Sequence, residues 1–133
     1  MGSNLPNAEK GYQELITVLG SAGEKVLEAL NSSCPDLARL FVSYPFGEIY
    51  SRPALDFKTR ELVAIAALAA QGTARPQLKM HILGALNVGC TRLEVVEVLL
   101  MMTVFAGFPA ALNAVDAMRE VFDEIDNPSK REN

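Results

Sequence analysis

The stretch DFKTRELVAIAALAAQG, residues 56–72, decides the fold of this chain. Asp56 can accept a hydrogen bond from the backbone at the start of a helix, and Gly72 can end one. Between them, the run from Leu62 to Ala70 is apolar on nearly every side of a helix. A helix of that kind lies buried on most sides. We therefore expect a central helix between Asp56 and Gly72.

The segment before this helix also follows a helical period. An apolar stripe over residues 8–19 ends at Gly20, and Ser21 can cap a short helix after it. Pro35 suits the first turn of a third helix, which Pro45 is expected to bend. The N-terminal half of the chain is thus predicted to be helical.

The segment after residue 72 predicts three more helices. One begins near Arg75 and ends at Asn87. Thr91 and Glu94 stand three residues apart, the spacing of a capping box, and open the next helix. A final helix follows Gly107. With few strand patterns to compete, the sequence predicts an all-α, compact bundle of about six helices.

The length and composition indicate one domain that associates with copies of itself. A chain of 133 residues has the usual size of a single domain, expected over 1–133 with its core at about 36–126 and a polar tail at 127–133. Half of the residues are hydrophobic, which is rich for a small monomer. Exposed apolar patches usually mark interfaces, so we expect a homo-oligomer.

Several classes of protein are disfavoured. No apolar run reaches the roughly 20 residues that span a bilayer, and Met1–Lys10 does not resemble a secretory signal. The formal net charge of −4, without a basic stripe, argues against nucleic acid. Cys34 and Cys90 form no CxxC pair, and His81 is the sole histidine, so no metal site is expected. Reduced thiols suit the cytoplasm.

Five blocks of sequence follow one another along the chain: FGEIYSRPALDFKTREL (46–62), QLKMH (77–81), ALNVG (85–89), EVVEVL (94–99) and FAGFPAA (105–111). Together they resemble the carboxymuconolactone decarboxylase family of the alkyl hydroperoxidase D-like superfamily. The resemblance covers about Phe41 to Phe122, most of the chain. It implies the all-helical fold of that superfamily. It also implies a homo-oligomer, either a trimer or a hexamer built as a ring of dimers, with sites near subunit contacts.

The resemblance also separates two chemistries. One branch of the superfamily uses a Glu, a CxxC pair and a His as a proton relay to a reactive thiolate. Here no cysteine lies between Glu61 and His81, and Thr73, Ala74 and Pro76 stand where the thiols would be needed. The chain therefore resembles the decarboxylase branch, which implies no cofactor.

The namesake reaction of the family removes carbon dioxide from an unsaturated lactone that bears carboxylates. It needs a group that binds the anionic substrate and one that stabilises the enolate oxygen. Arg52 and Arg60 are the candidates, because a guanidinium binds carboxylate with two parallel hydrogen bonds and stays charged. The alternative is an ordinary surface arginine, or one paired with Asp56 or Glu61.

The reaction also needs a proton donor, and His81 is the candidate general acid. Its neighbours on the predicted helix are apolar, so the ring is expected to face inward. Glu61 could orient it or hold a proton. The alternatives are a histidine that merely packs in the core or an interface, and a glutamate that stabilises a helix N-terminus.

Phe105, Phe108 and Asn113 are predicted to line the apolar wall of the substrate site. The alternative is that the two rings are plain core aromatics. The family often has Tyr where Phe105 stands, so a hydroxyl is missing here and the substrate is left open.

The sequence thus favours a cofactor-independent carboxy-lyase acting on a small anionic lactone or carboxylate. Two other readings stay open. One is a redox enzyme with Cys34 or Cys90 as a single reactive thiol. The other is a non-catalytic binding protein, because a fold does not establish chemistry.

Overall fold

A computed structural model describes residues 7–129 of the protein. All regular elements in this range are helical, which confirms the predicted all-α class. Residues 1–6 and 130–133 lie outside it, and with them part of the predicted polar tail and of the N-terminal segment considered as a signal. The chain divides between Arg60 and Glu61 into two compact units, each described by itself below.

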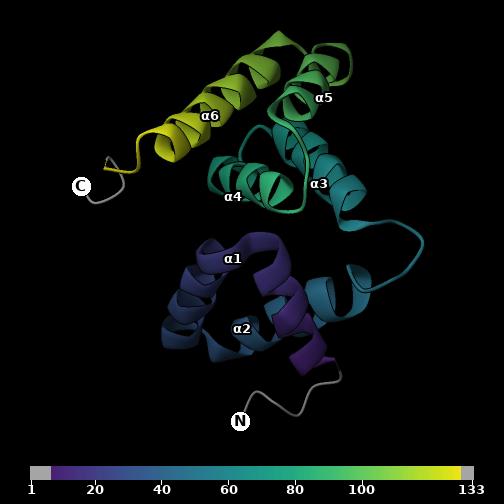
Figure 1. Cartoon of the computed structure of the whole chain (residues 1–133), viewed down its shortest axis with the longest axis vertical. Helices are drawn as coiled ribbons and strands as arrows, with labels where there is room; N and C mark the ends of the chain where they lie inside the picture. The colour runs from purple at the N-terminus through teal and green to yellow at the C-terminus, as the bar shows by residue number, and fades with distance from the viewer. Residues whose placement is uncertain (1–6, 130–133) are drawn as a thin grey trace. The chain divides into compact units, whose positions relative to one another are not determined.

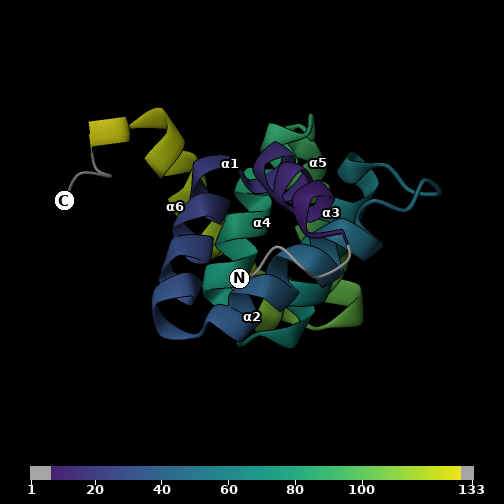
Figure 2. The same ribbon diagram turned by 90° about the horizontal axis from the view of Figure 1, so that it is seen from below.

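The first unit contains α1 (Ala8–Ser33), α2 (Pro35–Phe41) and the π-helix η2 (Val42–Ile49). Helix α1 has two arms that run in different directions (Figures 1 and 2). They meet at Gly20, whose φ of 58° and ψ of −140° are not helical. This confirms the break predicted at that glycine, since such a backbone conformation strains other residues.

Helices α1 and η2 approach so closely that their backbones touch. A methyl group added at Gly11 would lie 2.1 Å from the carbonyl oxygen of Val42. Glycine is required at this crossing because there is no room for a side chain. Both Gly11 and Val42 are buried.

The bend predicted at Pro45 takes the form of a π-helix. The N–H of Tyr50 donates to the carbonyl of Pro45, five residues back, at 2.8 Å. In an α-helix the proline ring would clash with the carbonyl four residues before it. The wider π turn relieves that clash, and the sequence pattern did not predict it.

The second unit holds the remaining helices, which confirm the predicted ones to within a few residues. They are α3 (Phe57–Gln71), which begins just before the division, α4 (Arg75–Asn87), α5 (Arg92–Phe105) and α6 (Phe108–Asp126). The capping box is also confirmed, because Glu94 N donates to Thr91 Oγ1 and Thr91 N to Glu94 Oε1, each at 3.0 Å.

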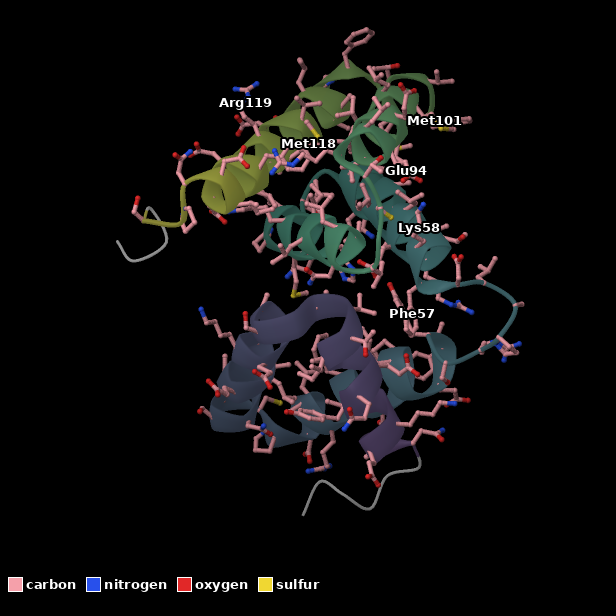
Figure 3. All side chains as sticks on the ribbon, in the orientation of Figure 1. Phe57, Lys58, Glu94, Met101, Met118 and Arg119 are labelled. Carbon is pink, nitrogen blue, oxygen red and sulfur yellow. The ribbon has the colours of Figure 1, made fainter. Side chains whose placement is uncertain are left out.

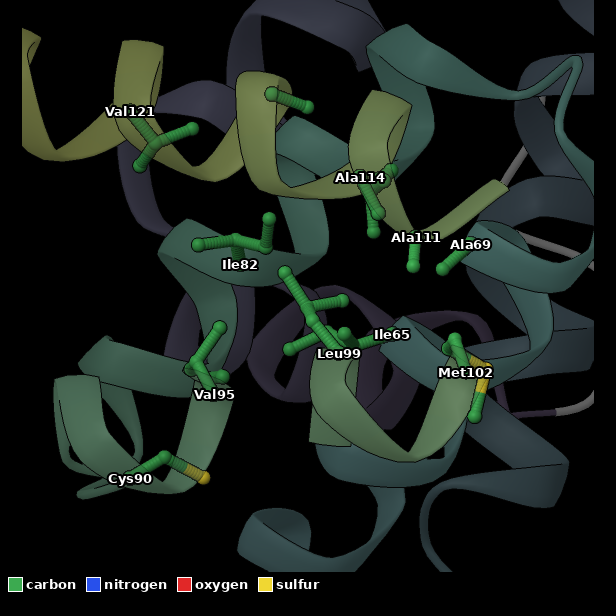
Figure 4. Packing of buried hydrophobic residues seen from close by; sticks show 13 residues of the cluster. Ile65, Ala69, Ile82, Cys90, Val95, Leu99, Met102, Ala111, Ala114 and Val121 are labelled. Atoms are coloured by element: carbon green, nitrogen blue, oxygen red, sulfur yellow. The ribbon is translucent and has the colours of Figure 1, made fainter. Parts of the chain in front are cut away.

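The core of the second unit is aliphatic. Helix α6 packs against both α4 and α5 (Figure 1). Figure 4 shows side chains of all four helices meeting in this core, among them Ile65, Ala69, Ile82, Val95, Leu99, Ala114 and Val121.

Helix α3 is less buried than its sequence predicted. Only Glu61, Ile65 and Ala69, at intervals of four residues, are fully buried. Val63 is 59% exposed. The prediction of burial on most sides is wrong for a single chain, because one face of the helix packs and the others remain uncovered.

Apolar side chains are also exposed around the turn between α5 and α6. Figure 3 shows Met101 pointing outward from α5. The exposed apolar residues of this surface, which we call the α5–α6 patch, are Leu100, Met101, Val104, Phe105, Phe108 and Leu112. Among the described helices, none combines the length and the apolar character that crossing a membrane requires.

Candidate active site

The start of α3 is fixed by Asp56. Its Oδ1 accepts a hydrogen bond from the backbone N–H of Thr59 at 2.8 Å, as predicted for an N-cap. Hydrogen bonds from the Thr59 hydroxyl and from its backbone N–H hold the pKa of Asp56 below its usual range. The cap sets where the helix begins, and so sets the face on which Glu61 lies.

Glu61 occupies the buried face of α3. The same face carries Ile65 and Ala69, one and two turns further on, so the carboxylate stands in a row that is otherwise apolar. Its side chain is 0% exposed. Burial of a charged group without a partner is very costly, so this position demands one.

The partner is His81 on α4. Nδ1 of His81 lies 2.8 Å from Oε2 of Glu61. The histidine is flanked on its helix by the buried Leu78 and Ile82, and its side chain keeps 16% of its surface exposed. The expectation that the ring faces inward is therefore confirmed, and the structure shows the contact with Glu61 that the sequence had left open.

This contact decides which nitrogen of His81 is available for chemistry. With Glu61 ionised, the carboxylate can only accept a hydrogen bond, so the tautomer that makes this contact carries its proton on Nδ1. Within the described residues, Nε2 has no hydrogen-bond partner. The ring can then exchange a proton through Nε2 while Glu61 holds its orientation.

Arg60 is engaged with the loop that precedes α3. Its Nε donates to the carbonyl of Leu55 at 3.1 Å and its Nη2 to the carbonyl of Arg52 at 2.9 Å. Its guanidinium lies 6.0 Å from the centre of the Tyr50 ring. The side chain fastens residues 52–55 rather than pairing with Asp56 or Glu61.

Arg52 is exposed, and only its backbone takes part in the contacts above. Across residues 7–129, its guanidinium has no ion pair or hydrogen bond. Arg52 and Arg60 belong to the first unit and are joined through the Arg52 carbonyl. Of the two arginines, Arg52 is the one free to receive an anion.

The remaining predicted site residues are much more exposed to solvent than Glu61 and His81. Phe105 is 74% exposed and Phe108 67% exposed, so the alternative that they are core aromatics is wrong. Their role in a substrate site stays a prediction. Asn113 lines a separate cavity in the second unit. Cys34 is exposed and Cys90 buried, and neither forms a disulfide within the described residues.

A row of aromatic rings beside Arg60 was not predicted from the sequence. Ring centres lie 5.6 Å apart for Phe41 and Phe46, 5.1 Å for Phe46 and Tyr50, and 6.3 Å for Tyr50 and Phe57. The five-residue step from Phe41 to Phe46 does not suit one face of an α-helix, and the π turn makes it fit. A test for π spacing could have found the row.

The described residues thus form a helical domain with a carboxylate–histidine pair whose glutamate is fully buried. The chain belongs to the carboxymuconolactone decarboxylase family, whose model matches residues 35–120. The resemblance seen in the sequence is thereby confirmed.

Individual relatives point to decarboxylases. The chain is 36% identical to the 4-carboxymuconolactone decarboxylase of Acinetobacter baylyi, over 90% of this chain and 92% of that protein. It is 35% identical to an uncharacterised 15.0 kDa protein of Paracoccus denitrificans, over 86% and 96%. It is 30% identical to the nitrosuccinic acid decarboxylase of Metarhizium robertsii, over 88% and 82%.

The cap at Asp56 generates a prediction about pH. Because the pKa of Asp56 is lowered in the folded state, the ionised cap stabilises that state above the unfolded pKa, and the effect is lost as the pH falls through the folded pKa. Asp56→Ala should lower Tm at about pH 7, and the gap to wild type should close below about pH 4. Asp56→Asn keeps an oxygen cap and should stay near wild type at neutral pH. Thermal unfolding followed by circular dichroism measures this, and a gap independent of pH would contradict it.

Proposed function

We propose that this protein is a cofactor-independent decarboxylase of a small anionic lactone or carboxylate, with His81 as its proton-transfer group. The observation that carries the proposal is the 2.8 Å contact between His81 Nδ1 and the fully buried Glu61. A carboxylate in that position fixes the tautomer and the orientation of the imidazole. Its two relatives named as decarboxylases support the reaction type.

The proposed reaction consumes one proton for each carbon dioxide released. The electron pair of the breaking carbon–carbon bond moves into a conjugated carbonyl and forms an enolate. Doubly protonated His81 then gives its Nε2 proton to carbon and becomes neutral, while Nδ1 keeps its hydrogen bond to Glu61. Solvent returns the proton before the next turnover.

In this proposal the two arginines have different roles. Arg52 binds a substrate carboxylate, because its exposed guanidinium has no competing partner among the described residues. Arg60 is a positioning residue, because two of its nitrogens are committed to backbone carbonyls of residues 52 and 55. It was expected to bind substrate or stabilise the enolate, and its hydrogen bonds argue for holding the Arg52 loop instead.

The assay begins with 4-carboxymuconolactone and nitrosuccinic acid, the compounds in the names of the two relatives. His81→Ala should lower kcat/KM by about 10²- to 10⁴-fold, the usual contribution of a general acid. Gln77→Ala, an exposed position one turn earlier on α4, serves as the matched control and should retain activity. Full activity in His81→Ala would remove the proposed role, and no turnover by the wild type would contradict the substrate class.

Glu61→Gln gives a spectroscopic test of the same site, since the chain has one histidine and its ring nitrogens give unambiguous NMR signals. In the wild type, the neutral ring should carry its proton on Nδ1. The glutamine amide can itself donate to Nδ1, so the proton should shift toward Nε2.

Arg52→Lys should raise KM about tenfold and change kcat little, because lysine keeps the charge but loses the two-pronged carboxylate contact. Lys58→Arg, on the first turn of α3, exchanges a neighbouring cation and serves as the control. Its KM should stay near that of the wild type. A large loss in kcat with unchanged KM would contradict simple carboxylate binding by Arg52.

We also propose that the protein acts as a homo-oligomer, a ring of dimers, in the cytoplasm, where an exposed free thiol such as Cys34 persists. The α5–α6 patch supports the association, since six neighbouring apolar side chains are exposed there.

Phe105→Asp should reduce the assembly to smaller species, because it introduces a charge into the α5–α6 patch. Leu37→Asp, at an exposed leucine of α2, is the matched control and should leave the mass unchanged. Light scattering during size-exclusion chromatography measures the mass. A monomeric wild type would contradict the proposed assembly.

A further inference from the structure

A cavity of about 180 Å³ lies in the second unit, at the end of α3, the start of α4 and the first turns of α6. Most of its lining is aliphatic, from Leu68, Ala69, Leu78, Ala110 and Ala114. For comparison, an enclosed apolar cavity of about 150 Å³ can take up benzene, and the cavity here is partly open to solvent. This cavity therefore has the size and the surface for one six-membered ring.

The cavity is separate from the proposed catalytic pair. Neither Glu61 nor His81 lines it. Along α3, Leu68 stands seven residues after Glu61, which is roughly 10 Å of helix. A molecule bound there would not touch the carboxylate–histidine contact.

The cations at and beside the cavity are already paired with carboxylates. Arg75 lines it, but Nη2 of that guanidinium lies 2.6 Å from Glu120 Oε2 and 3.1 Å from Asp116 Oδ2. Lys79 is likewise bound, to Glu120 at 2.8 Å and to Glu124 at 3.1 Å. Each of these two cations is thus held by carboxylates of α6, so neither is free to pair with a carboxylate on a ligand.

One polar group at the rim is uncommitted. Asn113 lines the cavity, and its backbone carbonyl lies 3.5 Å from Nη1 of Arg75. Within residues 7–129 its side-chain amide makes no hydrogen bond. The amide can therefore donate to, or accept from, one hydroxyl on a ligand.

We propose that this cavity binds a small uncharged ring compound, of about six to eight non-hydrogen atoms, that carries at most one hydroxyl group. The ring lies among Leu68, Leu78 and Ala114, and the hydroxyl group reaches Asn113. This site is distinct from the one proposed for the anionic substrate, and its ligand differs in charge.

The test is a methyl NMR titration of the full chain with benzene, phenol and benzoate. Benzene and phenol should shift the methyl signals of Leu68, Leu78 and Ala114 saturably. Benzoate should bind at least about tenfold more weakly, because its carboxylate would lose water without gaining a free cation. Ala110→Leu should fill the cavity and weaken benzene binding about tenfold. Ala67→Leu, the same change at an exposed position of α3, should leave it unaltered.

Benzoate binding as tightly as benzene would overturn the proposal, because the site would then be an anion site. Absence of saturable shifts with all three probes would also overturn it, including the case in which a side chain of a second copy fills the cavity. The wild-type comparison does not depend on whether Ala110→Leu folds. Since no turnover is measured, failure here is distinguishable from failure of the proposed decarboxylation.

Discussion

The carboxylate of Glu61 lies wholly out of solvent, and a charge in that position must be matched from within the protein. The chain has one histidine to offer, twenty residues further on, and the turn at Gly72, with its φ of 76°, lets the chain fold back between α3 and α4. The contact places Glu61 on the buried face of α3 and orients the imidazole of His81 on α4. Removing His81 would take this hydrogen bond from a carboxylate that lies out of solvent.

The loop of residues 52–55, which precedes α3, is stabilised by the side chain of Arg60. Two carbonyls of residues 52–55 accept hydrogen bonds from Arg60, and that guanidinium lies over Tyr50, the third ring of an aromatic row. Backbone carbonyls that would otherwise face water are thereby held by a permanently charged donor. Arg60 contacts Arg52 through the Arg52 backbone carbonyl, so the Arg52 guanidinium takes no part in holding this loop.

Short-range features could be predicted from the sequence, and long-range ones could not. The caps at Asp56 and Thr91 join residues three apart, so their side-chain types reveal them. The break at Gly20 follows from the backbone freedom of glycine. The acceptors of Arg60 are backbone carbonyls, which every residue has, so no pattern distinguishes them. The burial of α3 was overestimated, because an apolar helix does not say whether its cover comes from its own chain.

The π-helix η2 makes the first unit sensitive to chain length as well as to residue type. A π turn holds about one residue more than an α turn, so η2 in effect contains an insertion that the fold has absorbed. Losing one residue there would restore an α turn and rotate all that follows by about 100°. Tyr50 would then leave its place between Phe46 and Phe57. The number of residues in η2 is therefore fixed, and relatives of this chain should vary in length outside it.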